Sequence, residues 1–428
     1  MNTSIKTFML GWEFPPLING GLGTACYGLT KAMDRLGMNV IFLLPGSGPI
    51  SFPGKGEGAD FSGYQFKNVT FRVIDSPLRG YSSLAPEEAE QLNPEDAGLF
   101  DYGSELFAPA EEQKGFKIYG PDLFWSVEKY ANKAVKIAKK ENFDIIHAHD
   151  WMTYPAAMAV SKLKRRPFVA QVHSTEFDRS GENVNQRVYD IERAGMYAAD
   201  KVIAVSNYTR NIILRRYSVP ASKVEVVYNG VEHDKSRDCD LGRLPVKHEK
   251  IVLFLGRITM QKGPDYFVAA AKKVLEKMDD VKFVMAGSGD MMNRTIELVA
   301  RMGIGHKVLF TRFLQASNVR KAFRMADLYV MPSVSEPFGI TPLEAMSNNV
   351  PVLISKQSGV SEVLKNALKV DFWDTNLMPD RIIAVLKHAP LRKTLCEEGY
   401  KESYKFRWED SAARIYEIYG RTIKRAAS

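Results

Sequence analysis

The sequence has 428 residues, 45% of them hydrophobic and 25% charged, which is the composition of a globular protein large enough for two domains. Its formal net charge of +8 suits an anionic partner, but the basic residues are dispersed and form no recognisable nucleic-acid-binding module, so we expect a solvated basic surface, with peripheral membrane attachment as the main alternative. No apolar run approaches the ~18 residues that span a bilayer, and three widely spaced cysteines form neither a disulfide framework nor a zinc motif, which favours a cytoplasmic protein.

The first half of the chain alternates apolar runs with helical patterns, which predicts a parallel sheet covered by helices. Gly11–Pro16 interrupts the N-terminal apolar residues before a signal-peptide core could form, so these residues are expected to form a first buried strand. The expected strands are Lys6–Leu10, Asn39–Leu44, Asp144–Ala148, Pro167–Val172, Lys201–Val205 and Lys223–Val227. The expected helices include Ala25–Leu36, Val127–Glu141, Tyr154–Leu163 and Tyr208–Arg216.

The second half repeats the alternation, with strands expected at Ile251–Leu255, Val281–Ala286, Val308–Phe313, Leu328–Met331 and Val350–Ile354. The polar stretch Glu232–Glu249 is the expected linker. The sequence therefore predicts an α/β protein with a doubly wound domain over residues 1–235, a second over 246–405, and a last helix over 406–428. In such folds ligands bind beyond the carboxyl ends of the strands, so the loops there hold the candidate site.

The segment from about residue 50 to 125 departs from this alternation of apolar runs and helical patterns, because it is rich in Gly, Pro and acidic residues and also in aromatic ones. We expect an insertion with its own small core; a platform on which sugar rings stack is the alternative. The aromatic residues include Phe52, Tyr64, Tyr81, Tyr102, Phe107 and Trp125.

The stretch Ser335–Ala345 (S-E-P-F-G-I-T-P-L-E-A) places Glu336 and Glu344 on either side of a glycine-containing turn. Thr341 is expected to N-cap a helix that begins at Pro342, which would put Glu344 in a capping box. The N–H groups before this helix would then point outward, where an anion or a sugar hydroxyl can bind. The alternative is that Glu344 only closes its own helix.

Two cations, Arg257 and Lys262, lie in the loop after the strand Ile251–Leu255 and before a helix that begins with Pro264. A pair of cations at the carboxyl end of a strand is placed to neutralise a diphosphate, although two solvated side chains are the simpler alternative.

Two glycine-rich turns also follow strands. Gly20 and Gly21 precede the first helix and could bring backbone amides close to phosphate or sugar oxygens. Gly287 belongs to a shorter A-G-S-G-D turn that lacks the full dinucleotide-binding fingerprint. A simple sharp turn is the alternative at both places.

Polar residues end two further strands: His147, His149 and Asp150 end one, and His173 ends the next. Such a group could suggest a metal site, but no carboxylate or cysteine partner has the expected short spacing. We therefore predict no metal and favour a polar pocket that hydrogen-bonds a hexose.

Together these motifs resemble the retaining GT-B glycosyltransferases, nearest to the glycogen and starch synthases of the archaeal type. The resemblance covers nearly the whole chain except the aromatic-rich segment and the last turns. It rests on the Ser335–Ala345 string, the two cations, the H-x-H-D-W string at residues 147–151, an N-G-V string at residues 229–231 and the first glycine turn. It implies two Rossmann-like domains facing a central cleft, with no metal and no cofactor beyond the substrate, ADP-glucose or UDP-glucose.

The resemblance also implies a role for each matching residue. Arg257 and Lys262 would bind the donor diphosphate, Glu344 the nucleotide ribose, and Glu336 the donor sugar. The main-chain carbonyl of His173 would accept a hydrogen bond from the attacking hydroxyl. The rest of the donor-binding set would be Gly20, Gly21, Asp150, Asn229, Gly287, Gly339, Ile340 and Thr341.

One departure concerns the first glycine turn. Bacterial glycogen synthases usually carry K-x-G-G-L there, whereas this chain has Ile18 and Asn19 before Gly20. A donor-phosphate contact of that group is therefore expected to be missing or replaced here, which weakens the transfer of its nucleotide preference to this chain.

The expected activity is transfer of glucose, with retention, to the non-reducing end of an α-1,4-glucan. One alternative is the same chemistry on a small sugar, a sugar phosphate or a lipid-linked acceptor. Another is a glucan phosphorylase, which would need pyridoxal phosphate. A third is a non-catalytic glucan-binding protein that uses the aromatic segment. The donor base, the acceptor length and the oligomeric state stay open.

Overall fold

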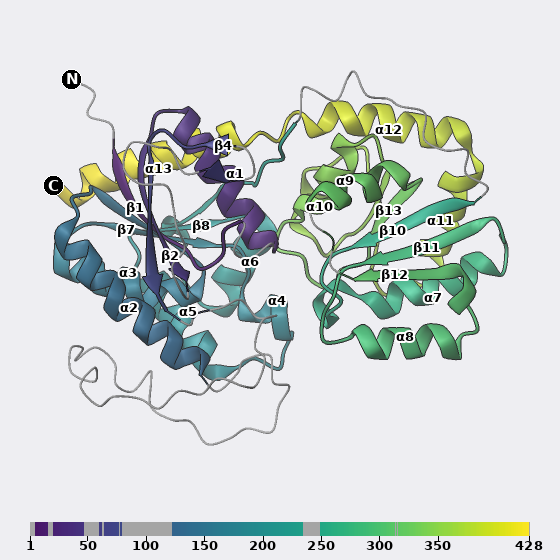
Figure 1. Cartoon of the computed structure of the whole chain (residues 1–428), viewed down its shortest axis with the longest axis horizontal. Helices are drawn as coiled ribbons and strands as arrows, with labels where there is room; N and C mark the ends of the chain where they lie inside the picture. Colours follow the sequence, from purple (N-terminus) through teal and green to yellow (C-terminus); the bar gives the residue numbers. More distant parts are fainter. Residues whose placement is uncertain are drawn as a thin grey trace.

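The computed structural model describes residues 5–15, 20–46, 60–61, 64–76, 78, 122–233, 249–312, 314 and 316–427. These residues form two α/β domains, each a parallel sheet with helices on both faces, as the sequence predicts. The domains lie side by side in Figure 1, the first coloured purple to teal and the second mainly green. No helix among the described residues is long and apolar enough to cross a membrane.

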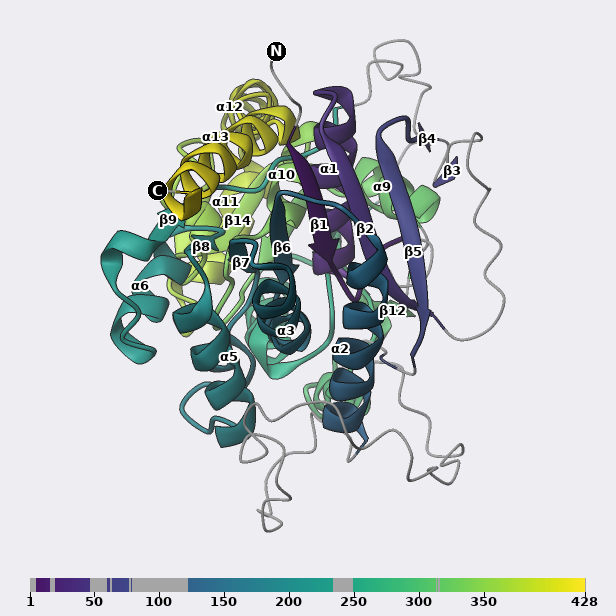
Figure 2. The same ribbon diagram turned by 90° about the vertical axis from the view of Figure 1, so that its left-hand side faces the viewer.

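The first domain is built on a seven-stranded sheet in which every pairing is parallel. Figure 2 shows the strand order β5-β2-β1-β6-β7-β8-β9 across the sheet. The central strands are runs of apolar residues because helices bury both faces of the sheet. The strands are β1 (Lys6–Leu10), β2 (Asn39–Gly46), β5 (Val69–Asp75), β6 (Ile145–His149), β7 (Phe168–Val172), β8 (Lys201–Ala204) and β9 (Val224–Val226).

Two groups of helices cover this sheet and create two apolar cores. One face is covered by α2 (Leu123–Lys140), α3 (Tyr154–Lys164), α5 (Gln186–Ala198) and α6 (Asn207–Arg216). The other face is covered by α1 (Gly21–Arg35) and α13 (Trp408–Ala427). A short helix, α4 (Glu176–Ser180), follows β7.

The described part of the 50–125 segment belongs to the first domain, so the expectation of a separate core is wrong for these residues. β5 forms the edge of the main sheet, and Phe66 and Phe71 pack against Phe14. An antiparallel pair, β3 (Asp60–Phe61) and β4 (Tyr64–Gln65), precedes it. Phe52, Tyr81, Tyr102 and Phe107 lie outside the described residues, as do residues 234–248 of the predicted linker.

The second domain has a six-stranded parallel sheet in the order β12-β11-β10-β13-β14-β15. Its strands are β10 (Lys250–Leu255), β11 (Val281–Ala286), β12 (Val308–Arg312), β13 (Leu328–Met331), β14 (Val352–Ser355) and β15 (Leu368–Val370). One face packs against α7 (Pro264–Leu275), α8 (Met292–Arg301) and α11 (Leu377–Lys387), the other against α9 (Ala316–Met325) and α10 (Ile340–Ser347). α12 (Ala389–Ser403) then contacts α10.

The last helix, α13, runs back over the first domain and packs against α1 (Figure 1). Trp408 at its start is buried, and Ile415 and Tyr419 continue the buried stripe. Glycine is needed opposite Trp408: a Cβ on Gly28 would lie 2.3 Å from the indole ring, and one on Gly230 would lie 2.4 Å from the Trp408 backbone nitrogen. The end of the chain therefore ties the two domains together.

Candidate functional site at the junction of the two domains

The strand order of each sheet reverses at one place, between β1 and β6 in the first domain and between β10 and β13 in the second. Ligands of doubly wound folds bind beyond the carboxyl ends of the strands at such a reversal. The loops that leave these four strands contain Gly20, Asp150, Lys262 and Glu336. The topology thus places the predicted motifs at the two positions where a ligand is expected.

In the second domain, Lys262 and Glu336 form an ion pair. Lys262 ends a short 3-10 helix after β10, and its side chain is 23% exposed; the Glu336 side chain is only 10% exposed. The two loops are also joined by their backbones, because the Val334 N–H donates to the Gln261 carbonyl over 2.9 Å. The residue assigned to the donor phosphate and the one assigned to the donor sugar therefore lie next to each other.

The helix after Glu336 begins earlier than predicted. α10 starts at Ile340, its N-cap is Gly339, and no side chain caps it, so the predicted N-cap at Thr341 and the capping box are wrong. The physical reason is the φ of +103° at Gly339, a conformation open mainly to glycine, which turns the chain into the helix sooner. Glu344 is half-buried and lies beyond the first turn, where it is not part of a capping box.

The turns after β10 and β11 pack on each other. A Cβ on Gly287 would lie 1.9 Å from the Gly256 carbonyl oxygen, and the Ile258 N–H donates to the Ser288 carbonyl over 3.0 Å. Close packing therefore accounts for the glycine at position 287. Arg257, between these contacts, is exposed.

In the first domain, a residue absent from the sequence-based set lies on the glycine turn. Glu13 is 6% exposed and accepts hydrogen bonds from the N–H groups of Gly20 and Gly23 at the start of α1. A Cβ on Gly20 would lie 2.1 Å from a Glu13 carboxylate oxygen, so glycine is required there. Burial raises the pKa of Glu13 to about 7, and the nearby Arg257 of the second domain opposes that rise. The predicted anion-binding turn thus holds a carboxylate of the chain itself.

Asp150 holds the backbone of the loop after β7. Its carboxylate accepts the His173 N–H over 2.6 Å and the Ser174 N–H over 3.4 Å. Asp150 has a φ of +60°, unusual for a residue with a side chain, and burial raises its pKa to about 7. Asp150, which the sequence predicts to contact the donor, positions the backbone of His173 in this structure.

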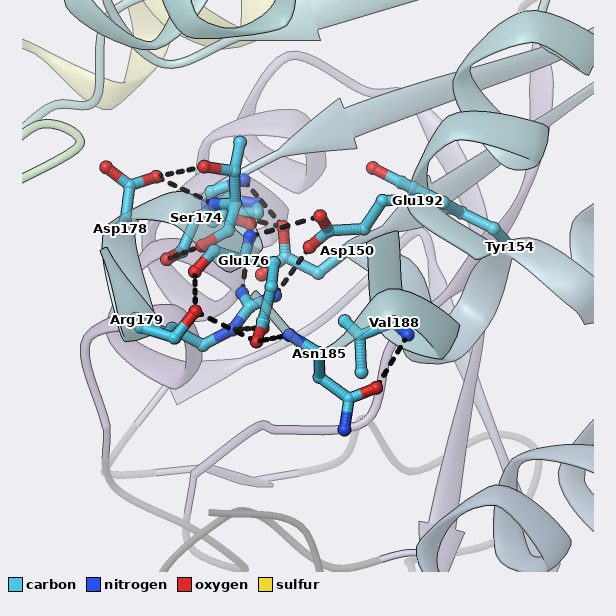
Figure 3. Close-up of polar contacts among 12 residues, drawn as sticks. Asp150, Tyr154, Ser174, Glu176, Asp178, Arg179, Asn185, Val188 and Glu192 are labelled. Atoms are coloured by element: carbon cyan, nitrogen blue, oxygen red, sulfur yellow. Dashed lines mark hydrogen bonds and ion pairs between the residues drawn. The ribbon is translucent and has the colours of Figure 1, made fainter. Parts of the chain in front are cut away.

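The loop after His173 is fixed by a buried ionic network (Figure 3). The guanidinium of Arg179 contacts Glu192 at 2.5 Å and Glu176 at 3.3 Å, and it donates to the Ser174 carbonyl over 3.2 Å. All three ionic side chains are at most 5% exposed. Removal of one partner would leave a buried charge uncompensated, so loss of any member of this network should strongly destabilise the loop.

Three histidines and a tyrosine form a chain of contacts behind the loop. Nδ1 of His149 and Nε2 of His173 are 2.9 Å apart, the rings of His147 and His149 stack with centroids 4.5 Å apart, and His147 Nδ1 bonds the Tyr419 hydroxyl of α13. Burial lowers the pKa of His147 and of His173 to about 3 and that of His149 well below its usual range. The imidazoles are therefore neutral at physiological pH.

Direct contacts join the two halves of the site. The Ser335 hydroxyl donates to Asp178 over 2.6 Å, and Tyr208 shares a 3.0 Å hydrogen bond with Ser335. Glu362 of the second domain accepts the N–H groups of Asn207, over 2.7 Å, and of Tyr208 at the start of α6. The two loops that carry His173 and Glu336 are thus held together.

The structure therefore brings together several of the predicted residues. It pairs Lys262 with Glu336, places Gly339 beside Glu336, and binds His173 to Asp150.

The remaining predicted residues have other surroundings. Ile340 packs against the cores of both domains. Gly21 is exposed at the start of α1, and Thr341 is half-buried in α10. Asn229 is different: it is buried after β9, next to the Gly230 on which α13 begins.

Sequence reasoning missed Glu13, Asp178 and Ser335. Glu13 could have been found from the sequence, because it is a charged residue in an otherwise apolar stretch directly after the first strand, where ligand-binding loops are expected. Asp178 and Ser335 are 157 residues apart, so no local pattern relates them.

Comparison with known proteins agrees with this geometry. Residues 242–402 match the family model "Glycosyl transferases group 1", and residues 101–235 match "Glycosyltransferase Family 4". An uncharacterized glycosyltransferase of Methanocaldococcus jannaschii is 30% identical over 97% of this chain and 98% of its own length. The chain therefore belongs to the GT-B glycosyltransferases.

More distant relatives have assigned activities. The glycogen synthase of Mycobacterium tuberculosis is 23% identical over 85% of this chain and 80% of its own. Two solved structures share the fold over 99% of this chain and all of theirs: sucrose-phosphate synthase from Thermosynechococcus elongatus, with a TM-score of 0.72 and 20% identity, and the catalytic domain of starch synthase IV from Arabidopsis thaliana bound to ADP and acarbose, with a TM-score of 0.70 and 17% identity.

Proposed function

We propose that this glycosyltransferase moves glucose, with retention of configuration, from ADP-glucose or UDP-glucose to the non-reducing end of an α-1,4-glucan. The observation that carries the proposal is the Lys262–Glu336 pair beside the N-terminus of α10, joined to the His173 loop through Ser335 and Asp178. The similarity to a glycogen synthase over 85% of the chain supports the choice of acceptor.

Each part of this arrangement has a task in the proposed reaction. Negative charge grows on the leaving diphosphate as the glycosidic bond breaks, and Lys262 and Arg257 would stabilise it. The N–H groups of Gly339, Ile340 and Thr341 would add the positive end of the α10 dipole. Glu336 would bind the donor sugar and Glu344 the nucleotide ribose.

The first domain would supply the acceptor side of the reaction. The carbonyl oxygen of His173 accepts no hydrogen bond from the described residues, and Asp150 fixes the backbone that carries it. This oxygen would accept a hydrogen bond from the acceptor hydroxyl, which would attack on the face that the diphosphate leaves. No metal or further cofactor takes part in the proposed reaction.

The test is release of nucleotide diphosphate from ADP-glucose, UDP-glucose and GDP-mannose, each with and without glycogen. The proposal expects glycogen-dependent release from a glucose donor and new glucan bonds that an α-specific glucosidase cleaves. β-Linked product would refute retention. Release of nucleotide diphosphate at the same rate with and without glycogen, or no release from either glucose donor, would refute the proposed acceptor.

A second candidate is the same transfer to a small phosphorylated acceptor. A D-inositol 3-phosphate glycosyltransferase of Corynebacterium diphtheriae is 24% identical over 68% of this chain, and the net charge of +8 suits an anionic acceptor. Release that requires a sugar phosphate or inositol phosphate instead of glycogen would favour this candidate.

A further inference from the structure

A cluster of potential metal-ligand atoms lies where β6 and β7 end, next to α1. One ligand atom each from Cys26, His149 and His173 lies within 4.8 Å of the other two. Cys26 comes from α1, and the two histidines come from the ends of β6 and β7. One ion could be bound by the three atoms after small side-chain movements that break the 2.9 Å hydrogen bond between His149 Nδ1 and His173 Nε2.

The polar groups of this cluster are incompletely satisfied. His149 is fully buried, and its Nε2 atom has no hydrogen-bond partner among the residues that the structure describes. A buried polar atom without a partner costs about 1–3 kcal/mol, so such atoms commonly mark a bound group or a functional constraint.

The chemistry of the donors selects the kind of ion. A thiolate and neutral imidazoles suit Zn²⁺ and Co²⁺, whereas Mg²⁺ and Ca²⁺ prefer carboxylate and carbonyl oxygens. Three protein ligands leave the fourth tetrahedral position for water. His173 as a whole is half-buried, whereas Cys26 and His149 are fully buried.

We propose that Cys26, His149 and His173 form a binding site for a Zn²⁺-class cation, and that its occupation inhibits the transferase. Binding would form a metal–sulfur bond and release the thiol proton to solvent. A cation held by the His173 ring would fix that side chain and occupy space beside the donor sugar. Binding is independent of the proposed function, whereas inhibition rests on it.

Binding is tested with Co²⁺ on the purified full chain, without donor or acceptor. We expect thiolate-to-cobalt absorption in the near ultraviolet and the intense visible bands of a four-coordinate ion. Cys26→Ser should abolish the charge-transfer band and weaken Co²⁺ binding at least about 10-fold. Cys396→Ser is the matched control, since this free cysteine lies on α12.

Inhibition is tested with Zn²⁺ during donor turnover. Zn²⁺ should lower wild-type turnover, a chelator should restore it, and Cys26→Ser should need at least about 10-fold more Zn²⁺ for the same loss. Cys26→Ala is a second variant in case serine disturbs folding. A Co²⁺ spectrum that is the same in wild type and Cys26→Ser would overturn the site. Equal Zn²⁺ sensitivity would overturn the inhibition. A Cys26-dependent spectrum in a protein without glucose transfer would support the metal site but refute the proposed function and the inhibition that rests on it.

Discussion

The hydroxyl of Ser335 donates a 2.6 Å hydrogen bond to the carboxylate of Asp178, and this bond joins the two domains beside the candidate site. Ser335 directly precedes Glu336. Asp178 forms a capping box with Thr175, the N-cap of α4, and Thr175 lies two residues after His173 in the sequence. Since His173 and Glu336 belong to different domains, their relative position depends on contacts of this kind.

Ser335→Ala should therefore lower transfer without unfolding the protein. A hydrogen bond to a charged group contributes about 1.5–3 kcal/mol, which corresponds to a loss of roughly 10- to 100-fold in kcat/KM if the bond is needed in the transition state. The measurement is donor turnover at saturating glycogen, together with the thermal midpoint. Ser161→Ala is a matched control, because its hydroxyl bonds the Arg166 carbonyl next to α3. Turnover of Ser335→Ala within twofold of wild type would show that the bond does not position the site.

Most of the fold could be predicted from sequence because the strands of a buried parallel sheet are apolar runs. β1, β11 and β13 have the predicted bounds. β14 begins at Val352 instead of Val350, and the intervening Pro351 has no N–H to donate to a sheet. β5 was missed because its half-buried residues lie in a segment rich in Gly and Pro, and β15 because three residues show no periodicity.

Site residues could be predicted from the sequence where they belong to one local motif. They could not be predicted where segments distant in the sequence come together only in the fold. Lys262 and Glu336 lie in recognisable strings, and the structure pairs them. The start of α10 was misplaced because it depends on the backbone conformation of Gly339, which its neighbours do not encode. Glu13 and Arg257 come together only through the packing of one domain on the other.

Lys262→Ala should reduce kcat strongly, because a fixed cation at the leaving diphosphate acts most in the transition state. Removing one such group typically costs about 10²- to 10³-fold. Glu336, paired with Lys262, should also be sensitive, and turnover of Glu336→Ala within a few-fold of wild type would contradict its role. The matched control is Lys272→Ala on α7, where the side chain is 43% exposed and contacts Glu276. Equal turnover of the two lysine variants would contradict the role of Lys262.

Two glycine variants should distinguish the contribution of α13 packing against α1 from that of the intrinsic helix propensity of α13. Gly28→Ala should destabilise the protein by about 1–3 kcal/mol, because the new Cβ would lie 2.3 Å from the Trp408 ring. Gly420→Ala in α13 should be neutral or stabilising by up to about 1 kcal/mol, because an added Cβ would meet nothing within 4 Å outside the backbone of its own helix. Chemical denaturation measures both. If Gly28→Ala were as stable as wild type, the close docking of Trp408 on α1 would be wrong.

Glu13→Gln should change how stability depends on pH. Burial raises the folded pKa of Glu13 from 4.5 to about 7, despite the opposing charge of Arg257, so between these values the folded protein holds a proton that the unfolded chain has lost. The free energy of unfolding therefore falls as pH rises through this window, by about 3 kcal/mol in full, at 1.36 kcal/mol per pH unit. Glu13→Gln removes this loss, so it should match wild type near pH 4 and be more stable at pH 8. The raised pKa of Asp150 lies in the same range, so the free energies of unfolding of wild type and Glu13→Gln must be compared with each other at each pH. An unchanged difference between pH 4 and pH 8 would show that Glu13 keeps its ordinary pKa.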